Sequence, residues 1–158
     1  MKRLALIHGV NLDMLGRRPR EHYGTLTLPE LEQRVVAYAG ERGFHTSTFQ
    51  TNHEGVLVEY LHELAASGPD AVMINPGAWT HYSYAVRDAL ELIASPIAEV
   101  HLSAIDQRED WRRVSVIEDV ATVRVAGKGL EGYREAVDQL AREVAAGVAR
   151  RNDPSNDD

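Results

Sequence analysis

Short apolar runs alternate along the chain with longer stretches whose apolar residues recur every three or four positions. The runs at 3–8, 70–75 and 97–102 are almost entirely apolar, a pattern typical of strands buried on both faces of a parallel sheet. Residues 45–51 alternate between polar and apolar side chains, as expected of an outer strand, and residues 121–126 form a further apolar run. The pattern therefore predicts five strands.

Helical periodicity fills the intervals between these strands. Thr27 and Glu30 form a capping box at the start of the first helix, and Gly43 follows its end. We expect Asn52 to cap the second helix, and Pro96 follows the third. The predicted buried stripes are Leu28, Leu31, Val35 and Ala39; Leu57, Leu61 and Leu64; Val86, Ala89, Leu90 and Ile93; and Tyr133, Val137, Leu140, Val144 and Val148.

Strands that alternate with helices predict an α/β fold in which a five-stranded parallel sheet is doubly wound, flavodoxin-like in architecture. A chain of 158 residues fits one domain with a sizeable core. We expect this single catalytic domain to span residues 1–149. The tail at 150–158 is polar and interrupted by proline, and we expect it to be disordered.

Composition narrows the class of protein. The hydrophobic share of 44% and charged share of 26% match an ordinary soluble domain, and the net charge of −7 disfavours a nucleic-acid partner. The absence of cysteine excludes disulfides, thiolate nucleophiles and cysteine-based zinc sites. The apolar run "LALI" near the start is too short for a signal peptide or a membrane span. We therefore expect a cytoplasmic protein without a membrane partner.

The candidate chemistry lies where the predicted strands end. In open α/β sheets, ligands bind beyond the carboxyl ends of the strands. We therefore expect one edge of the sheet to bring together Asn11, Asn75, His81, His101 and Ser103. Amides and imidazoles beside several guanidiniums suit a small, oxygen-rich acid.

The stretch "AEVHLSAIDQREDWRR" ends an apolar strand on His101 and continues into a charged loop that holds Arg108 and Arg112. A substrate carboxylate would bind the backbone N–H groups near Leu102 and Ser103. Arg112, together with His81, would hold hydroxyl groups.

The loop between Gly16 and Gly24 has the features of a lid over this site. It contains three arginines and Tyr23 between two possible glycine hinges. A phenol with an ordinary pKa of about 10 is a poor base, but the nearby guanidinium of Arg18 favours its ionised form. Proton abstraction beside a carbonyl by Tyr23, with His101 donating to a leaving hydroxyl, would be a dehydration.

The chain resembles the type II dehydroquinases. The matching stretches are "GVNLDMLGRR", "YGTLTL", "QTNHEG", "INPGAWTHYSYAVRDAL", "AEVHLS" and "REDWRRVS", and they extend in order from residue 4 to about residue 144. No single stretch is specific, but the ordered set is. The resemblance implies a hydro-lyase that converts 3-dehydroquinate to 3-dehydroshikimate through an enolate in the shikimate pathway, without a cofactor or a metal.

The resemblance also implies a role for each candidate residue. Tyr23 would be the proton acceptor, His101 the proton donor, Arg18 the stabiliser of the phenolate and the transition state, and Asn11 a partner of the enolate through water. Ring hydroxyls would be bound by Asn75, His81 and Arg112, and the carboxylate by the backbone of Leu102 and Ser103. Asp88 would reach a neighbouring subunit's site, because the family forms trimers that assemble into dodecamers (tetramers of trimers).

Several positions depart from the family pattern. The usual Asn-Gly-Pro-Asn is "HGVN" here, with His8 and Val10 substituted. The usual Arg-Glu-Pro of the lid reads Arg18, Pro19 and Arg20. The remaining departures are Ala104, Asp106 and Val114. None of them removes a residue to which a role is assigned above.

Each candidate residue also has a structural alternative. His101 could be a strand-end histidine whose hydrogen bonds are satisfied, and His81 could cap the helix that begins near Tyr82. Tyr23 could be a packing aromatic, and the charged loop around it a solvated surface. Asp88 could be a surface carboxylate paired with an arginine of its own chain.

Other functions are compatible with parts of the sequence. A divergent dehydratase of a related cyclic polyol acid, or a role in quinate catabolism, remains open. A type I dehydratase needs a Schiff-base lysine, and only Lys2 and Lys128 are present. A phosphoreceiver needs an aspartate at the position of Asn75. A flavin site needs a Ser/Thr/Gly-rich loop after the first strand, which the sequence lacks. No HExxH motif supports a zinc site on His81 and His101.

Overall fold

A computed structural model describes residues 1–151 of the chain. Its centre is a five-stranded sheet in the order β2-β1-β3-β4-β5, and every pairing is parallel. The strands are β1 (Lys2–His8), β2 (Phe44–Gln50), β3 (Ala71–Asn75), β4 (Ile97–His101) and β5 (Val123–Ala126). The predicted doubly wound, flavodoxin-like sheet is confirmed.

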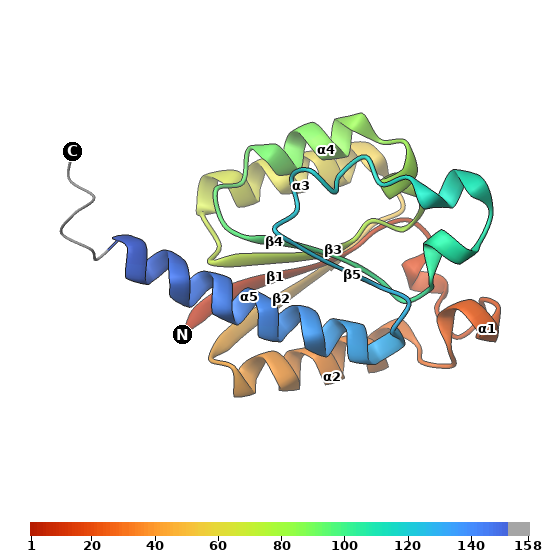
Figure 1. Cartoon of the computed structure of the whole chain (residues 1–158), viewed down its shortest axis with the longest axis horizontal. Coiled ribbons are helices and arrows are strands. Elements are labelled where there is room, and N and C mark those ends of the chain that lie inside the picture. The colour runs from red at the N-terminus through yellow and green to blue at the C-terminus, as the bar shows by residue number, and fades with distance from the viewer. Residues whose placement is uncertain (152–158) are drawn as a thin grey trace.

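Helices cover both faces of the sheet (Figure 1). Helices α2 (Leu28–Glu41) and α5 (Gly129–Arg151) lie on one face, and α3 (Glu54–Ser67) and α4 (Tyr84–Glu91) lie on the other. Shorter elements connect them: α1 (Arg20–Tyr23) and the 3₁₀ turns η1 (Leu12–Met14), η2 (Gly77–His81), η3 (Ile105–Gln107) and η4 (Asp110–Arg113). Within the described residues, no helix is both long and apolar enough to cross a membrane.

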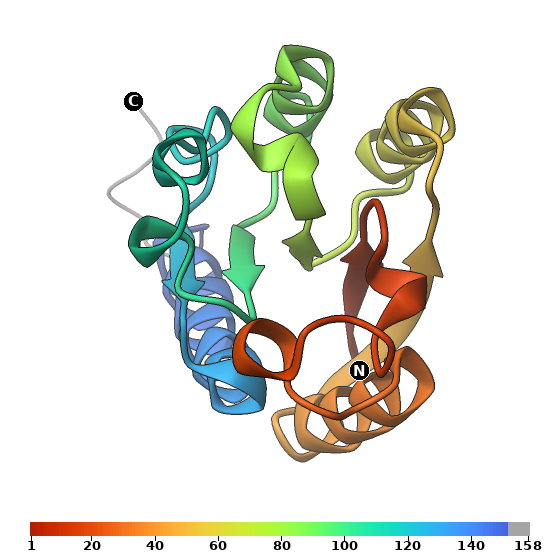
Figure 2. The ribbon, with the colours of Figure 1, turned by 90° about the vertical axis from the view of Figure 1, so that its right-hand side faces the viewer.

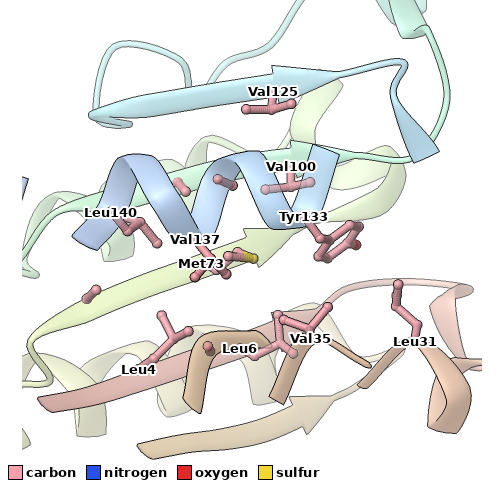
Figure 3. Close-up of a cluster of buried hydrophobic side chains, with 14 of the residues drawn as sticks. Leu4, Leu6, Leu31, Val35, Met73, Val100, Val125, Tyr133, Val137 and Leu140 are labelled. Atoms are coloured by element: carbon pink, nitrogen blue, oxygen red, sulfur yellow. The ribbon is translucent and has the colours of Figure 1, made fainter. Parts of the chain in front are cut away.

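Two apolar cores form because side chains of a strand alternate between the faces of the sheet. Leu4 and Leu6 of β1 pack with the α2 and α5 side chains, among them Val35 and Val137 (Figure 3). Ile7 faces the opposite core under α3 and α4. The helical stripes predicted for residues 28–144 are buried as expected.

The local predictions for helix starts have mixed outcomes. The capping box is confirmed, because the Thr27 backbone N–H donates to Glu30 at 3.0 Å and the Glu30 N–H donates to the Thr27 hydroxyl at 3.4 Å. The prediction that Asn52 caps α3 is wrong. His53 precedes that helix without a side-chain cap, and the Asn52 amide oxygen instead accepts the backbone N–H of Asn11 at 2.9 Å.

Element ends differ from prediction by a few residues. Strand β4 ends at His101, one residue before the predicted end, and β5 begins at Val123. Helix α5 continues through Arg151, two residues beyond the predicted domain end at 149. The rest of the predicted disordered tail, 152–158, lies outside the described residues.

The carboxyl ends of the strands meet at the side of the molecule where α1 and the turns gather (Figures 1 and 2). Two glycines allow the segments that follow β1 and β3 to approach closely. The Gly9 N–H donates to the Asn75 carbonyl at 2.7 Å, and a Cβ at Gly9 would overlap the backbone carbonyl of Pro76. Gly77 has a φ of 63°, and a Cβ there would lie 2.6 Å from the Val10 carbonyl oxygen. These contacts fix the segments after β1 and β3 against each other, next to the candidate residues.

Candidate active site

A cavity that opens to solvent lies at this carboxyl edge. Residues from five parts of the chain line it: η1 after β1, the lid, the end of β3 with η2, the end of β4 with its loop, and η4. Eight of the ten candidate residues are among them: Arg18, Tyr23, Asn75, His81, His101, Leu102, Ser103 and Arg112. Four of the five residues expected at this edge from the strand ends, Asn75, His81, His101 and Ser103, line one cavity, and Asn11 does not.

The Tyr23 hydroxyl lies between two guanidinium groups. Arg18 Nη2 and Arg108 Nη1 each donate a hydrogen bond to this oxygen at 2.7 Å. The Arg18 guanidinium also stacks on the Tyr23 ring, with Cζ 3.6 Å from the ring centroid. Burial lowers the pKa of Arg18, and the neighbouring Tyr23 opposes that shift. Two positive charges therefore lie at one phenol oxygen and hold the hydroxyl in place.

Arg108 had no assigned role in the sequence interpretation. Its Nη1 reaches Tyr23 and also lies 3.5 Å from the Ser103 hydroxyl oxygen. Arg108 comes from the turn after β4, whereas Tyr23 comes from the lid. This guanidinium therefore joins the lid to the floor of the cavity.

His101 forms a pair with the fully buried Glu99, two residues earlier in β4. The His101 Nε2 lies 2.6 Å from Glu99 Oε2. An ionised carboxylate only accepts hydrogen bonds, so Nε2 carries a proton and Nδ1 is the ring nitrogen that can serve a ligand. The Glu99 carboxylate therefore fixes the orientation of the His101 ring and leaves Nδ1 outside this pair.

Glu99 stays ionised in spite of its burial. Burial alone would raise the pKa of Glu99, but hydrogen bonds from His101, Thr80 and Ser115 outweigh it and hold the pKa below its usual value. The Thr80 hydroxyl donates at 2.6 Å and the Ser115 hydroxyl at 2.8 Å. The His101 ring is therefore paired with a buried negative charge, the Glu99 carboxylate.

His81 faces the same cavity in a defined tautomer. Its Nδ1 lies 2.7 Å from the Val114 carbonyl oxygen, which can only accept, so Nδ1 carries the hydrogen. Burial lowers the pKa of His81, and the nearby His101 and Arg112 lower it further. The neutral ring leaves Nε2 as an acceptor for a hydroxyl group. The alternative in which His81 caps the next helix is wrong, because the Ser83 hydroxyl accepts the Val86 N–H there.

Asn75 is held by two of its own hydrogen bonds. Its Oδ1 accepts the Gly77 N–H at 3.0 Å, and its Nδ2 donates to the buried Tyr133 hydroxyl at 3.2 Å. Burial raises the pKa of Tyr133 to about 12, so this hydroxyl remains protonated at any working pH. One amide hydrogen of Asn75 is left for a ligand.

Comparisons with known proteins show the family of the chain. The family model described as "Dehydroquinase class II" matches residues 2–141. The chain belongs to this family.

Similar proteins match most of the chain. The chain is similar to the 3-dehydroquinate dehydratase of Syntrophotalea carbinolica, with 47% identity over 84% of this chain and 90% of the relative. A fungal relative from Neosartorya fischeri, named catabolic 3-dehydroquinase 2, shares 42% identity over 91% of this chain and 95% of its own length. The crystal structure of the type II dehydroquinase from Propionibacterium acnes superposes with a TM-score of 0.86 at 39% identity, covering 90% of this chain and 97% of that one.

Two candidate residues lie outside the cavity of this class II dehydroquinase chain. Asn11 is exposed in a left-handed conformation with a φ of 67°, and its N–H bonds to Asn52. Asp88 has a side chain that is 73% exposed, and it pairs with Arg87 of the same chain at 2.9 Å. Asp88 therefore does not line the cavity of its own chain.

The sequence interpretation of this dehydroquinase missed Glu99, Arg108 and Tyr133. Glu99 could have been found, because a carboxylate inside an apolar strand two residues before His101 must face the same side. Arg108 is one of three arginines in "REDWRR", and spacing does not distinguish them. Within residues 1–151, no group of three histidine, aspartate or glutamate side chains gathers as a metal site would require.

Proposed function

We propose that this chain is a 3-dehydroquinate dehydratase of the shikimate pathway, which eliminates water from 3-dehydroquinate to form 3-dehydroshikimate. One observation carries the proposal: the Tyr23 hydroxyl, held by two guanidiniums, lines the same cavity as the Glu99-paired His101. A base and an acid on one small cavity are what an elimination requires.

The elimination proceeds in two proton transfers. The Tyr23 phenolate removes a proton from the carbon next to the ketone, and the electron pair of the broken C–H bond forms the enolate. The enolate then expels the hydroxyl as its C–O bond breaks, and His101 supplies the proton that completes the water molecule. Tyr23 ends protonated and His101 neutral, so one proton returns through solvent before the next turnover. Atoms and charges balance without a cofactor or a metal.

The remaining cavity residues bind the substrate in this proposal. Asn75, the neutral His81 and Arg112 hold the ring hydroxyls, and the backbone N–H groups of Leu102 and Ser103 take the carboxylate. Arg112 is aimed by its neighbours, because its Nε donates to Glu109 at 2.7 Å and its guanidinium stacks on Trp111. Asn11 would act on the enolate through a water.

Oligomer formation is part of the proposal. Exposed large apolar side chains suit contact with a second copy of the chain: Tyr82, Trp111 and Val114 beside the cavity residue His81, and Tyr84 and Leu92 at the two ends of α4. We propose trimers assembled into a dodecamer, in which Asp88 reaches the neighbouring site. Light scattering of the purified protein measures the assembly, and a monomer would contradict it. We also propose a cytoplasmic location, which cell fractionation checks.

The function is tested by following the ultraviolet absorbance of the conjugated product. Purified protein should form 3-dehydroshikimate from 3-dehydroquinate near neutral pH, and the absence of product would refute the proposal. Tyr23→Phe should remain folded and lose turnover, because the base is removed and the ring is kept. Borohydride with substrate should leave the enzyme unmodified, which separates this chemistry from Schiff-base dehydratases. Turnover of other quinate-like acids should be far slower.

A further inference from the structure

The buried carboxylate behind His101 has a second cationic neighbour on the adjacent strand. Arg124 Nε lies 3.4 Å from Glu99 Oε1, while His101 Nε2 lies 2.6 Å from Glu99 Oε2. The two cations therefore share one carboxylate through different oxygens. None of the steps described above uses Arg124.

The sheet register creates this arrangement. Glu99 in β4 and Arg124 in β5 are direct cross-strand partners, and His101 is paired with Ala126. Val123 and Val125 face the core under α5, so Arg124 between them faces the opposite side of the sheet, where Glu99 lies. The position of Arg124 is thus set by backbone pairing and strand alternation.

The burial of the two partners differs strongly. The Glu99 side chain is fully buried, whereas the Arg124 side chain is 37% exposed. Because β5 lies at the edge of the sheet, the arginine can pair with the buried anion and still keep contact with water. A guanidinium remains charged at every working pH. Glu99 consequently has a permanent positive neighbour, in addition to one whose charge changes with the proton on His101.

We propose that Arg124 is a positioning residue that makes His101 a stronger proton donor by sharing the charge of Glu99. This inference rests on the proposed dehydratase function. A carboxylate that is already paired with a guanidinium attracts an imidazolium less strongly, so His101 releases its proton more readily to the departing hydroxyl. Arg124 touches no substrate in this account and acts only through Glu99.

The test removes the charge of Arg124 and measures the titration of His101 directly. The other charged or titratable side chains that face the Glu99–His101 pair or its cavity are His81, Arg112, Arg18, Arg108 and Tyr23, and the variants leave them unchanged. In Arg124→Gln, the midpoint of the His101 imidazole titration, followed by NMR, should move to higher pH by about half a unit to one unit. The high-pH limb of kcat should move with it, and the plateau of kcat should fall about two- to threefold with KM unchanged.

Matched variants separate charge from structure. Arg124→Lys keeps the charge and should restore the wild-type titration. Arg134→Gln removes an arginine of similar exposure (48%) from the surface of α5 and should leave the titration of His101 unchanged. If Arg124→Gln fails to fold by circular dichroism, Arg124→Met keeps the apolar stem and should show the same shift.

A His101 titration that superposes on the wild type in the uncharged variants, or that moves to lower pH, would overturn the proposal. The NMR readout needs no turnover. If the wild-type protein forms no product from 3-dehydroquinate, the proposed function fails while the coupling of Arg124 to His101 is still tested.

Discussion

The Arg108 guanidinium donates to the Tyr23 hydroxyl at 2.7 Å, although 85 residues separate the two along the chain. Arg18, five residues before Tyr23, donates to the same oxygen at the same distance. The phenol is therefore held by one cation from its own loop and one from the opposite side of the cavity. This arrangement leads to the first prediction.

Arg108→Met should lower kcat by about 10- to 100-fold, because a hydrogen bond to a charged group contributes about 1.5–3 kcal/mol. The phenolate would lose half of its cationic support, while its ring would remain stacked on Arg18. Steady-state absorbance kinetics measure the effect. Arg20→Met, at an exposed position of the same lid, is the control and should keep wild-type kcat. Equal kcat values for both variants would show that Arg108 does not support the Tyr23 base.

Glu99→Gln should lower kcat by about 100-fold with little change in KM, since the neutral amide no longer stabilises the imidazolium form of His101. With the amide oxygen in place of Glu99 Oε2, Thr80 and Ser115 can both still donate to it, so the fold should survive. Single-turnover kinetics with circular dichroism on the same sample separate the two effects. A Glu99→Gln enzyme with normal kcat would show that the buried anion is structural only.

Tyr133→Phe should raise KM several-fold and leave kcat nearly unchanged. The substitution removes the acceptor of Asn75 Nδ2, and the freed amide is no longer held in the orientation needed for a ring hydroxyl. The loss of one buried hydrogen bond should also lower the free energy of unfolding by about 1 kcal/mol. Initial rates over a range of substrate concentrations test the first effect, and urea unfolding tests the second. A change confined to kcat would contradict this account.

His8 should make the stability of the fold sensitive to acid. Burial lowers the pKa of His8 to about 4, although Glu32 lies 3.2 Å away, and neither ring nitrogen has a hydrogen-bond partner among the described residues. The unfolded chain takes up this proton near pH 6.5, but the folded chain does so only near pH 4. The free energy of unfolding should therefore fall as the pH is lowered through this window, by about 3 kcal/mol in total.

The variant His8→Asn isolates this contribution. It should lose that part of the pH dependence, whereas His45→Asn, at an exposed position, should keep it. Urea unfolding at pH 7, 6 and 5 gives the comparison. If His8→Asn and the wild type lose stability in parallel, the buried imidazole is not the acid-sensitive group.

Gly9→Ala should prevent correct folding or abolish turnover. The added Cβ would overlap the backbone carbonyl of Pro76, and backbone atoms cannot move aside as a flexible side chain could. Gly55→Ala, where nothing lies within 4 Å of the new Cβ, is the matched control and should fold normally. Thermal unfolding of both variants measures the difference.

The fold was predictable because the sequence patterns that determine its strands and helices are local. Strand alternation, helical stripes and the Thr27–Glu30 box reflect interactions between residues a few positions apart. Asn52 shows where local reasoning fails: it is a good cap by type, but its amide is used by the Asn11 backbone, 41 residues away. That competition depends on the three-dimensional path of the loop after β1.

The site was predictable to the extent that it depends on strand ends. Asn75 and His101 lie at the carboxyl ends of neighbouring strands, so topology alone placed them on one rim. The inward-facing arginine of the loop after β4 could not be chosen in this way, because Arg108 is oriented by the short turns η3 and η4. Irregular turns carry no periodic pattern from which a direction could be inferred.

The two arginines at Tyr23 belong to different parts of the molecule: Arg18 lies in the lid, and Arg108 lies in the loop after β4. An outward swing of residues 16–24 would take the phenol and Arg18 away together and leave Arg108 behind. Both guanidiniums would then contact the Tyr23 oxygen only while the lid is closed over the substrate. In the open enzyme without substrate, Tyr23 would lack the Arg108 hydrogen bond and would be a less reactive base. The base would therefore be fully assembled only with substrate in the cavity.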